Sequence, residues 1–193
     1  MEIRSSEVDR GLLLRIAARD EAALAELYDR HSRLAYSIIM RILRSPSDAE
    51  EVLQETFVRV WSRTDTYNAV LGSPAAWLTR IARNRAIDWL RARRSQENGV
   101  GEPVVSADGA ADAIGPITRD TPETALEDDA TAGAVRTVLA SLTPSQRELI
   151  EAAFFEGYTH IELAARFGLP LGTVKTRIRS GLAAMRDRLE QVI

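Results

Sequence analysis

Residues 159–180 limit the fold of this chain more than any other stretch, because they contain the start and stop signals of two short helices. Thr159 and Glu162 have the spacing in which a hydroxyl and a carboxylate satisfy each other's free backbone donors. We therefore expect a helix from the next residue after Thr159. Gly168 can adopt the left-handed backbone that ends a helix, and Pro170 prevents its continuation. Two helices should meet across a tight turn.

The second helix is predicted to follow Gly172, a flexible joint, with the Thr173 hydroxyl as its cap. Apolar residues recur at spacings of four and form an inner seam on both helices: Leu163, Phe167, Val174, Ile178 and Leu182. The outward face then carries Lys175, Thr176, Arg179 and Ser180. Such a face can read base edges in the major groove of DNA. A helical hairpin with a merely solvated basic face is the alternative, but the combined signals favour DNA binding.

Charge is distributed unevenly along the chain, although the formal net charge is only -3 over 193 residues. Residues 74–94 hold six Arg against one Asp, whereas residues 102–129 hold eight acidic residues against one Arg. Local patches of opposite sign determine which partners a surface attracts more than the sum does. A hydrophobic content of 45% is enough for ordinary buried cores.

The chain has no cysteine, which excludes disulfides, thiolate chemistry and Cys-ligated zinc within it. Charged residues interrupt the N-terminal segment, so that it has no apolar core of a signal peptide, and no later run approaches the length of a membrane span. We expect a cytoplasmic protein without membrane insertion.

The N-terminal part is predicted to be helical from its capping signals. Ser6 with Asp9 indicates a cap for a first helix, Asp20 for a second, and Ser47 with Glu50 a capping box for a third. The three helices should carry apolar stripes at helical spacing: Leu12, Leu13 and Ile16; Leu24, Leu27, Leu34, Ile38, Ile42 and Leu43; Val52, Leu53, Thr56, Phe57, Val60 and Trp61.

Residues 62–73 are predicted to form a loop, after which Ser73 caps a helix with Pro74 in its first turn. Trp77, Leu78, Ile81, Ile87 and Leu90 should face inward on that helix. The remaining face is basic and carries Arg80, Arg83, Asn84, Arg91, Arg93 and Arg94. A basic helix after an aromatic-bearing loop suits single-stranded nucleic acid. Tyr67 is the better stacking candidate, because Trp77 and Trp89 are expected in the core.

From Ser95 to about Asp129 the composition shifts to Gly, Pro, Ala, Asp and Glu without apolar periodicity, which is typical of a flexible acidic linker. A helix should begin near Val135, and Thr143 with Gln146 should cap the next one, which Gly157 ends. Strand patterns and internal repeats are not evident. We therefore predict two small all-α domains joined by a tether.

An enzyme active site is not expected. The two histidines, His31 and His160, fall in different predicted domains, and the chain lacks phosphate-binding and dinucleotide-binding glycine motifs. Glu50, Glu51 and Glu55 form an acidic cluster without an imidazole, so a solvated or protein-binding helix face is favoured over a metal site. We predict no cofactor, no metal and no catalytic residue.

Five segments together resemble bacterial RNA polymerase sigma factors of the extracytoplasmic-function (ECF) branch. The segments are DAEEVLQETFVRVW (48–61), AWLTRIARNRAIDWLR (76–91), LTPSQRE (142–148), FEGYT (155–159) and LPLGTVKTRI (169–178). The resemblance covers both predicted domains in the same order. It implies a region-2 domain over residues 1–94, a linker over residues 95–132 and a region-4 helix-turn-helix domain over residues 133–193.

The resemblance also implies partners and contact residues. Region 2 would bind the clamp helices of core RNA polymerase through Asp48, Glu51, Gln54 and Glu55. It would hold the minus-10 element, with one base flipped from the stack, through Tyr67, Arg80, Arg83, Asn84 and Arg91. Region 4 would touch the polymerase flap and read the minus-35 element through Thr173, Lys175, Thr176, Arg177, Arg179 and Ser180. An anti-sigma factor is a further implied partner.

Similar sigma factors often have Arg-Ala where this chain has Ser180 and Gly181, so that one Arg contact is missing. The glycine is expected to soften the helix locally by about 1 kcal/mol. A stand-alone DNA-binding regulator, in which residues 1–94 sense a ligand or dimerise, is the alternative. The acidic face at residues 48–55 and the Arg-rich helix disfavour it, because a ligand pocket needs neither.

Overall fold

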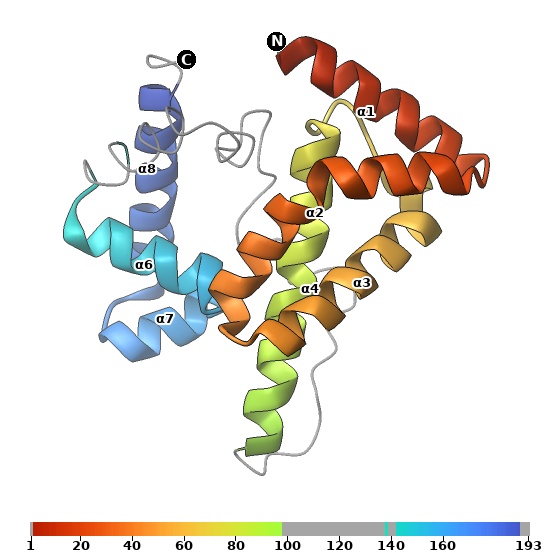
Figure 1. The fold of residues 1–193 in the computed structure, drawn as a ribbon. Helices are drawn as coiled ribbons and strands as arrows, with labels where there is room; N and C mark the ends of the chain where they lie inside the picture. Colours follow the sequence, from red (N-terminus) through yellow and green to blue (C-terminus); the bar gives the residue numbers. More distant parts are fainter. Residues whose placement is uncertain (1, 98–137, 139–141, 190–193) are drawn as a thin grey trace. The chain divides into compact units, whose positions relative to one another are not determined.

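The computed structural model describes residues 2–97, 138 and 142–189, and the chain divides into two compact units. The regular secondary structure of these residues is entirely helical, which confirms the predicted fold class. The first unit contains α1 (Glu2–Ala17), α2 (Glu21–Leu43), α3 (Pro46–Arg63), the 3₁₀ helix η1 (Thr64–Thr66) and α4 (Pro74–Glu97) (Figure 1). The second contains α6 (Pro144–Phe155), α7 (His160–Phe167) and α8 (Leu171–Leu189).

Most of the predicted helix starts are confirmed by hydrogen bonds. Asp20 accepts from the backbone N–H groups of Ala22 and Ala23 at 3.0 and 3.2 Å, and the Ser73 hydroxyl accepts from Ala76 N at 3.2 Å. The boxes Thr143 with Gln146 and Thr159 with Glu162 are both complete, and Gly157 and Gly168 follow α6 and α7 with positive φ. These signals act within a few residues, so the local sequence is enough to define them.

Three predicted starts were wrong. Asp9 lies in the middle of α1, which begins at Glu2, and α3 begins at Pro46 rather than after Ser47. Proline is favoured at a first helical position because its fixed φ suits the helix and its missing N–H is not needed there. Helix α8 also begins earlier than predicted, at Leu171 directly after Pro170, so that Thr173 lies inside its first turn and is not the cap.

Two further segments differ from the prediction: one contains helix where a loop was predicted, and one helix is longer than predicted. The predicted loop at residues 62–73 contains the end of α3 and the short helix η1. Helix α4 runs past Ser95, where the linker was expected to begin, to Glu97. The rest of the predicted linker, and most of the helix predicted near Val135, lie outside the described residues.

The core of the first unit forms where α2, α3 and α4 pack against one another. The predicted apolar stripes are largely confirmed. The buried members are Leu12, Leu13, Ile16, Leu27, Leu34, Ile38, Ile42, Val52, Leu53, Thr56, Phe57, Val60, Trp77, Leu78 and Ile87. Trp77 is thus a core residue, as predicted, and Trp89 is half-buried.

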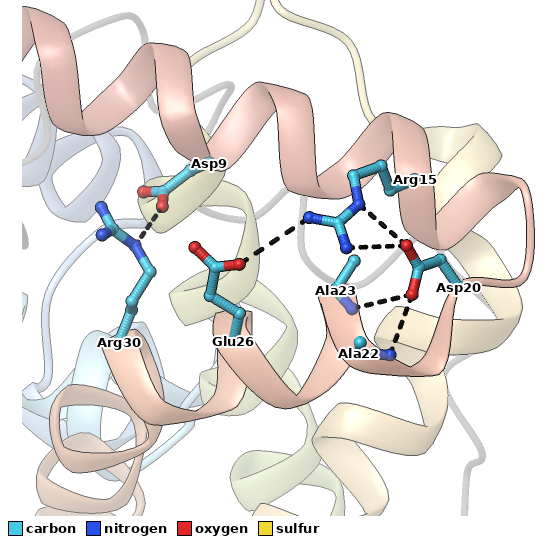
Figure 2. A network of polar contacts seen from close by, with 7 residues as sticks. All are labelled: Asp9, Arg15, Asp20, Ala22, Ala23, Glu26 and Arg30. Carbon is cyan, nitrogen blue, oxygen red and sulfur yellow. Dashed lines mark hydrogen bonds and ion pairs between the residues drawn. The ribbon is translucent and has the colours of Figure 1, made fainter.

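Helix α1 packs against α2, and polar contacts join the two (Figure 2). Arg30 on α2 donates through Nε to Oδ1 of Asp9 at 2.7 Å. Arg15, near the end of α1, pairs with Asp20 at 2.8 Å and lies 3.8 Å from Glu26. The Arg15 pairs are exposed and each contributes little, whereas Asp9 is only 2% exposed. Among these polar contacts, the Asp9 contact is therefore expected to contribute most to the packing of α1 on α2.

The second unit closes around the predicted seam of the helix-turn-helix. Leu163, Val174 and Ile178 are buried, and Phe167 and Leu182 pack against them. Helix α8 contacts both α6 and α7. The approach to α6 is close at Gly181, where an added Cβ would lie 2.7 Å from Ile150 Cδ1 and 3.3 Å from Gln146 Cβ. Beyond the softening expected from the sequence, this glycine makes room for α6.

Candidate nucleic-acid interface

Helix α8 separates an anchoring face from an exposed basic face. Val174 and Ile178 are buried and anchor one face of the helix. Lys175, Thr176 and Arg179 are all exposed. They occupy neighbouring positions at helical spacings of three and four, and they form one stripe. We call Lys175, Thr176 and Arg179 the α8 stripe.

Two of the other predicted contact residues of α8 bond to α6, and the third is half-buried. Arg177 is half-buried and donates through Nη1 to the Ser145 hydroxyl at 2.7 Å. Ser180 accepts from Gln146 Nε2 at 3.0 Å and donates to the Arg177 carbonyl at 3.1 Å. Thr173 is also half-buried. Of the six predicted residues, the structure thus leaves four exposed, namely Lys175, Thr176, Arg179 and Ser180, and two half-buried, Thr173 and Arg177.

Two exposed residues at the start of α8 were missed by the sequence analysis. Leu171 is 37% exposed, and Gly172 is exposed as well. Both were assigned to the turn, because the Thr173 hydroxyl was taken as the cap. The Pro170 carbonyl instead accepts from Thr173 N and Val174 N at 2.9 and 3.1 Å. Pro170 cannot continue α7, and this was the signal that a new helix could begin directly after it.

His160, the first residue of α7, is electrostatically linked to Lys175. Burial lowers the pKa of His160, and the charge of Lys175 lowers it further. Both effects disfavour the imidazolium, so His160 is neutral at pH 7. The positive charge of this surface therefore comes from Lys and Arg and not from histidine.

The loop before α4 is ordered by its own contacts. The Tyr67 ring meets the Trp77 ring edge-on, with centroids 5.7 Å apart, and its hydroxyl donates to the Gly72 carbonyl at 3.1 Å. Asn68 Oδ1 accepts from Val70 N at 2.9 Å. Val70 and Leu71, which the sequence analysis did not single out, are exposed at the tip. Tyr67 is half-buried. One part of its side chain therefore packs within the loop, and the other part is accessible at the surface.

The basic face of α4 is mixed in exposure. Arg80 is exposed, while Arg83, Asn84 and Arg91 are half-buried. Arg83 donates to Asn84 Oδ1 at 3.2 Å, which joins two of the predicted residues. Asp88 lies on the same helix. Its pKa is raised by burial, against the opposing charges of Arg85, Arg91 and Arg59.

On the acidic face of α3, two of the predicted side chains are exposed and two form ion pairs with α4. Glu51 and Gln54 are exposed. Asp48 and Glu55 instead form ion pairs with α4, Asp48 with Arg93 at 3.2 Å and Glu55 with Arg85. The exposed Val58 lies one helical turn after Gln54 and was not foreseen from the sequence. This face can therefore offer a protein partner both charge and one apolar side chain.

Within residues 2–97 and 142–189 no three His, Cys, Asp or Glu side chains gather into a group that could hold a metal ion. None of the helices in these ranges is long and apolar enough to cross a membrane.

Comparison with known proteins assigns both units. Residues 27–96 match Sigma-70 region 2, and residues 138–187 match Sigma-70, region 4. These matches define the class as a sigma-70-type protein with one region in each unit. They favour the sigma factor over the stand-alone regulator, because region 2 occupies the part that the regulator would use for ligand sensing or dimerisation.

The chain is also similar to individual sigma factors of the ECF branch. The ECF RNA polymerase sigma factor SigK of Mycobacterium tuberculosis is 33% identical over 187 residues, which cover 96% of this chain and 95% of SigK. SigK of Mycobacterium sp. (strain KMS) is 33% identical over 178 residues, with 92% and 89% covered. A chain in the crystal structure of Rhodobacter sphaeroides SigE in complex with the anti-sigma ChrR is 36% identical with a TM-score of 0.45, covering 91% of this chain and 96% of that chain.

The chain belongs to the ECF family of RNA polymerase sigma factors. It is a transcription initiation factor that directs core RNA polymerase to specific promoters.

Proposed function

We propose that three faces of this sigma factor divide the work of initiation. The α8 stripe reads the minus-35 element, the loop and basic face of α4 hold the minus-10 strand, and the acidic face of α3 binds the clamp helices of core polymerase. The proposal takes residues 1–94 and 133–193 as the two working domains and residues 95–132 as their linker. The protein has no catalysis of its own and acts in the bacterial cytoplasm.

The observation that carries the proposal is the α8 stripe. Lys175, Thr176 and Arg179 share an exposed face, while Val174 and Ile178 anchor the opposite face. Cationic and hydroxyl side chains can donate to guanine edges and to phosphates in the major groove. Thr173, Arg177 and Ser180 belong to the proposed contact set at the margins of the stripe.

For the minus-10 strand the proposal uses Arg80, Arg83, Asn84 and Arg91 of α4 with the loop at Tyr67. The guanidinium groups neutralise phosphates, and the Asn84 amide provides the hydrogen bonds that tell one unstacked base from another. The internal contacts of the loop support this assignment, since a preformed binding surface avoids the ordering cost that a flexible one would pay.

For core polymerase the proposal uses Asp48, Glu51, Gln54 and Glu55. Glu51 and Gln54 are exposed and can meet a basic helix directly. Asp48 and Glu55 are ion-paired with Arg93 and Arg85, so their contribution requires that these pairs be shared or exchanged. The flap contact of region 4 and an anti-sigma factor complete the set of partners, on the ground of family membership.

Transcription from mapped promoters tests the proposal. Transcript starts recorded after overexpression would supply the promoter DNA. Purified chain with core polymerase should then give a promoter-dependent transcript, and the double variant Lys175→Ala/Arg179→Ala should lose most of it while keeping its thermal midpoint. If the wild-type chain gave no transcript above core alone, the proposal would be wrong.

A charge reversal tests the α3 assignment separately. Glu51→Lys should prevent capture of core polymerase by the tagged chain, because it places a cation against a basic partner. Glu50→Lys is the matched control, since Glu50 is exposed on the same helix but points about 100° away. Equal capture by the two variants would contradict the assignment.

A further inference from the structure

The turn between α1 and α2 is fastened to the end of α3 by the side chain of Arg19 (Figure 1). Its guanidinium carbon lies 5.3 Å from the centre of the Trp61 ring, and its Nη1 donates to the Trp61 carbonyl at 3.3 Å. We propose that Arg19 is a positioning residue for the minus-10 strand. It holds the end of α3, beyond which the loop with Tyr67 begins, and it does not itself touch DNA. The inference rests on the proposed binding of that strand by the loop and α4.

The end of α3 favours a cation. The last carbonyl groups of a helix have no partner within it, and they form the negative end of the helix dipole. Trp61 lies in the last turn of α3, which ends at Arg63, and its ring is half-buried. The Arg19 guanidinium therefore satisfies one of these carbonyls and also faces the ring, which attracts a cation. Both contacts restrain the same end of the helix.

A short hydrogen-bonded path leads from this end of α3 to the loop. Thr64, the first residue of η1, is buried, and its hydroxyl donates to the Val60 carbonyl at 2.7 Å. The Thr64 carbonyl accepts from Tyr67 N at 3.1 Å. Helix α1 also contacts η1 directly. The position of the end of α3 therefore determines where the Tyr67 loop starts.

The turn that carries Arg19 has its own backbone contacts. Arg19 N donates to the Ile16 carbonyl at 2.8 Å, and Arg19 has a left-handed backbone with φ 66°. Glycine is the usual residue in this conformation after a helix. The backbone alone does not distinguish Arg19, because Arg44 after α2 shares it with φ 55°. The assignment of Arg19 therefore rests on its two contacts with Trp61.

Arg19→Gly tests the inference, with Arg44→Gly as its matched control. Glycine adopts the left-handed backbone of both positions without strain, so neither variant should have a lower thermal midpoint. The mapped promoter supplies two probes: a fork whose non-template strand is single-stranded over the minus-10 element, and an upstream duplex that ends before this element. The holoenzyme made with Arg19→Gly should bind the fork about fivefold more weakly than wild type.

The upstream duplex and the control variant define the outcomes. Arg19→Gly should bind the duplex as wild type does, and Arg44→Gly should bind both probes as wild type does. An arginine that only stabilised the fold would leave the fork affinity of the assembled holoenzyme unchanged. Wild-type binding of the fork by Arg19→Gly would therefore overturn the inference. Equal losses on the fork and the duplex would also overturn it, because the loop is proposed to act on the minus-10 strand alone.

A second substitution tests whether Arg19 acts through Trp61. Trp61→Leu removes the ring and should itself weaken binding of the fork. In that background Arg19→Gly should change fork affinity by less than about twofold. Arg19→Lys keeps a cation for the ring and should recover most of the loss that Arg19→Gly causes. An undiminished effect of Arg19→Gly in the Trp61→Leu background, or no recovery with lysine, would contradict the inference.

Asn84→Ala separates this inference from the proposed function. If Asn84→Ala weakens binding of the fork and Arg19→Gly does not, only the inference about Arg19 is wrong. If both variants bind the fork as wild type does, the proposed minus-10 role of the loop and α4 is wrong as well.

Discussion

His31 on α2 and Asp9 on α1 are joined by a buried hydrogen bond of 2.9 Å between Nε2 and Oδ2. Because a carboxylate can only accept, the proton lies on Nε2 of His31. Its Nδ1 is buried and has no hydrogen-bond partner among the residues that the structure describes. Arg30 donates to the other oxygen of Asp9, so that one carboxylate on α1 receives two donors from α2. This clasp of Asp9, Arg30 and His31 joins α1 to α2, in addition to the buried apolar side chains Leu12, Leu13 and Ile16 of α1.

Removal of the carboxylate should destabilise the first unit. Asp9→Ala leaves the buried His31 and the partly buried Arg30 without their acceptor, and we expect a loss of about 2–4 kcal/mol in the free energy of unfolding. Urea denaturation measures it. Asp29→Ala, an exposed aspartate on α2, is the control and should change stability by less than about 0.5 kcal/mol. A similar small change for Asp9→Ala would show that the clasp contributes nothing.

The contribution of Asp9 should depend on pH in one direction. Burial alone would raise the pKa of Asp9, but the hydrogen bonds and charges of His31 and Arg30 outweigh it, and the pKa is lowered. A lowered pKa stabilises the fold above the ordinary aspartate value near 4, and this contribution disappears as the pH falls through the lowered value. The stability gap between wild type and Asp9→Asn should therefore be full at pH 6 and close below pH 4. A gap that widened on acidification would contradict this.

Gly181 and Ile150 should be energetically coupled. Gly181→Ala gains about 1 kcal/mol of helix propensity, but its methyl group would need the space that Ile150 Cδ1 occupies. Ile150→Val removes that carbon. We expect Gly181→Ala to be more favourable by about 1 kcal/mol in the Ile150→Val background than in wild type. Gly172→Ala, which touches nothing, should behave identically in both backgrounds. Independence of the two substitutions would contradict the close contact.

Substitutions of Lys175 and Arg177 on α8 should have different effects on stability and on DNA affinity. Lys175→Ala should weaken promoter binding by roughly tenfold without lowering the thermal midpoint, because its side chain is exposed. Arg177→Ala should cost about 1 kcal/mol of stability, because it removes the hydrogen bond to Ser145. Ser145→Ala should reproduce that stability loss and leave affinity unchanged. An unchanged midpoint for Arg177→Ala would show that this contact to α6 is dispensable.

Exchanging the charges of Glu55 and Arg85 can distinguish the structural role of Glu55 in the ion pair from its proposed role in binding core polymerase. Glu55→Arg and Arg85→Glu should each destabilise the first unit, because like charges then face each other between α3 and α4. The double exchange should restore stability. It should still capture core polymerase poorly, because the α3 face has lost a carboxylate. Recovery of capture together with stability would give Glu55 a purely structural role.

The sequence determined the helices and much of their orientation. The boxes at Thr143 and Thr159 and the left-handed Gly168 were predicted correctly because each depends on residues only three or four positions away. The buried seam of Val174 and Ile178 followed from helical periodicity, and with it the exposed position of Lys175. Local signals failed where proline and a hydroxyl competed for the same start, as at Pro46 and Pro170.

The tertiary structure decided which polar residues form hydrogen bonds with distant parts of the same chain. Asp9 matched the spacing of a cap, yet it meets a histidine 22 positions away. Arg177 matched a basic surface residue, yet it bonds to Ser145, 32 positions away. Such pairs depend on how two helices are rotated and how closely they approach, and that is determined by side-chain packing across the whole unit. Helical periodicity specifies the face of a residue, but not the neighbour that packing brings to that face.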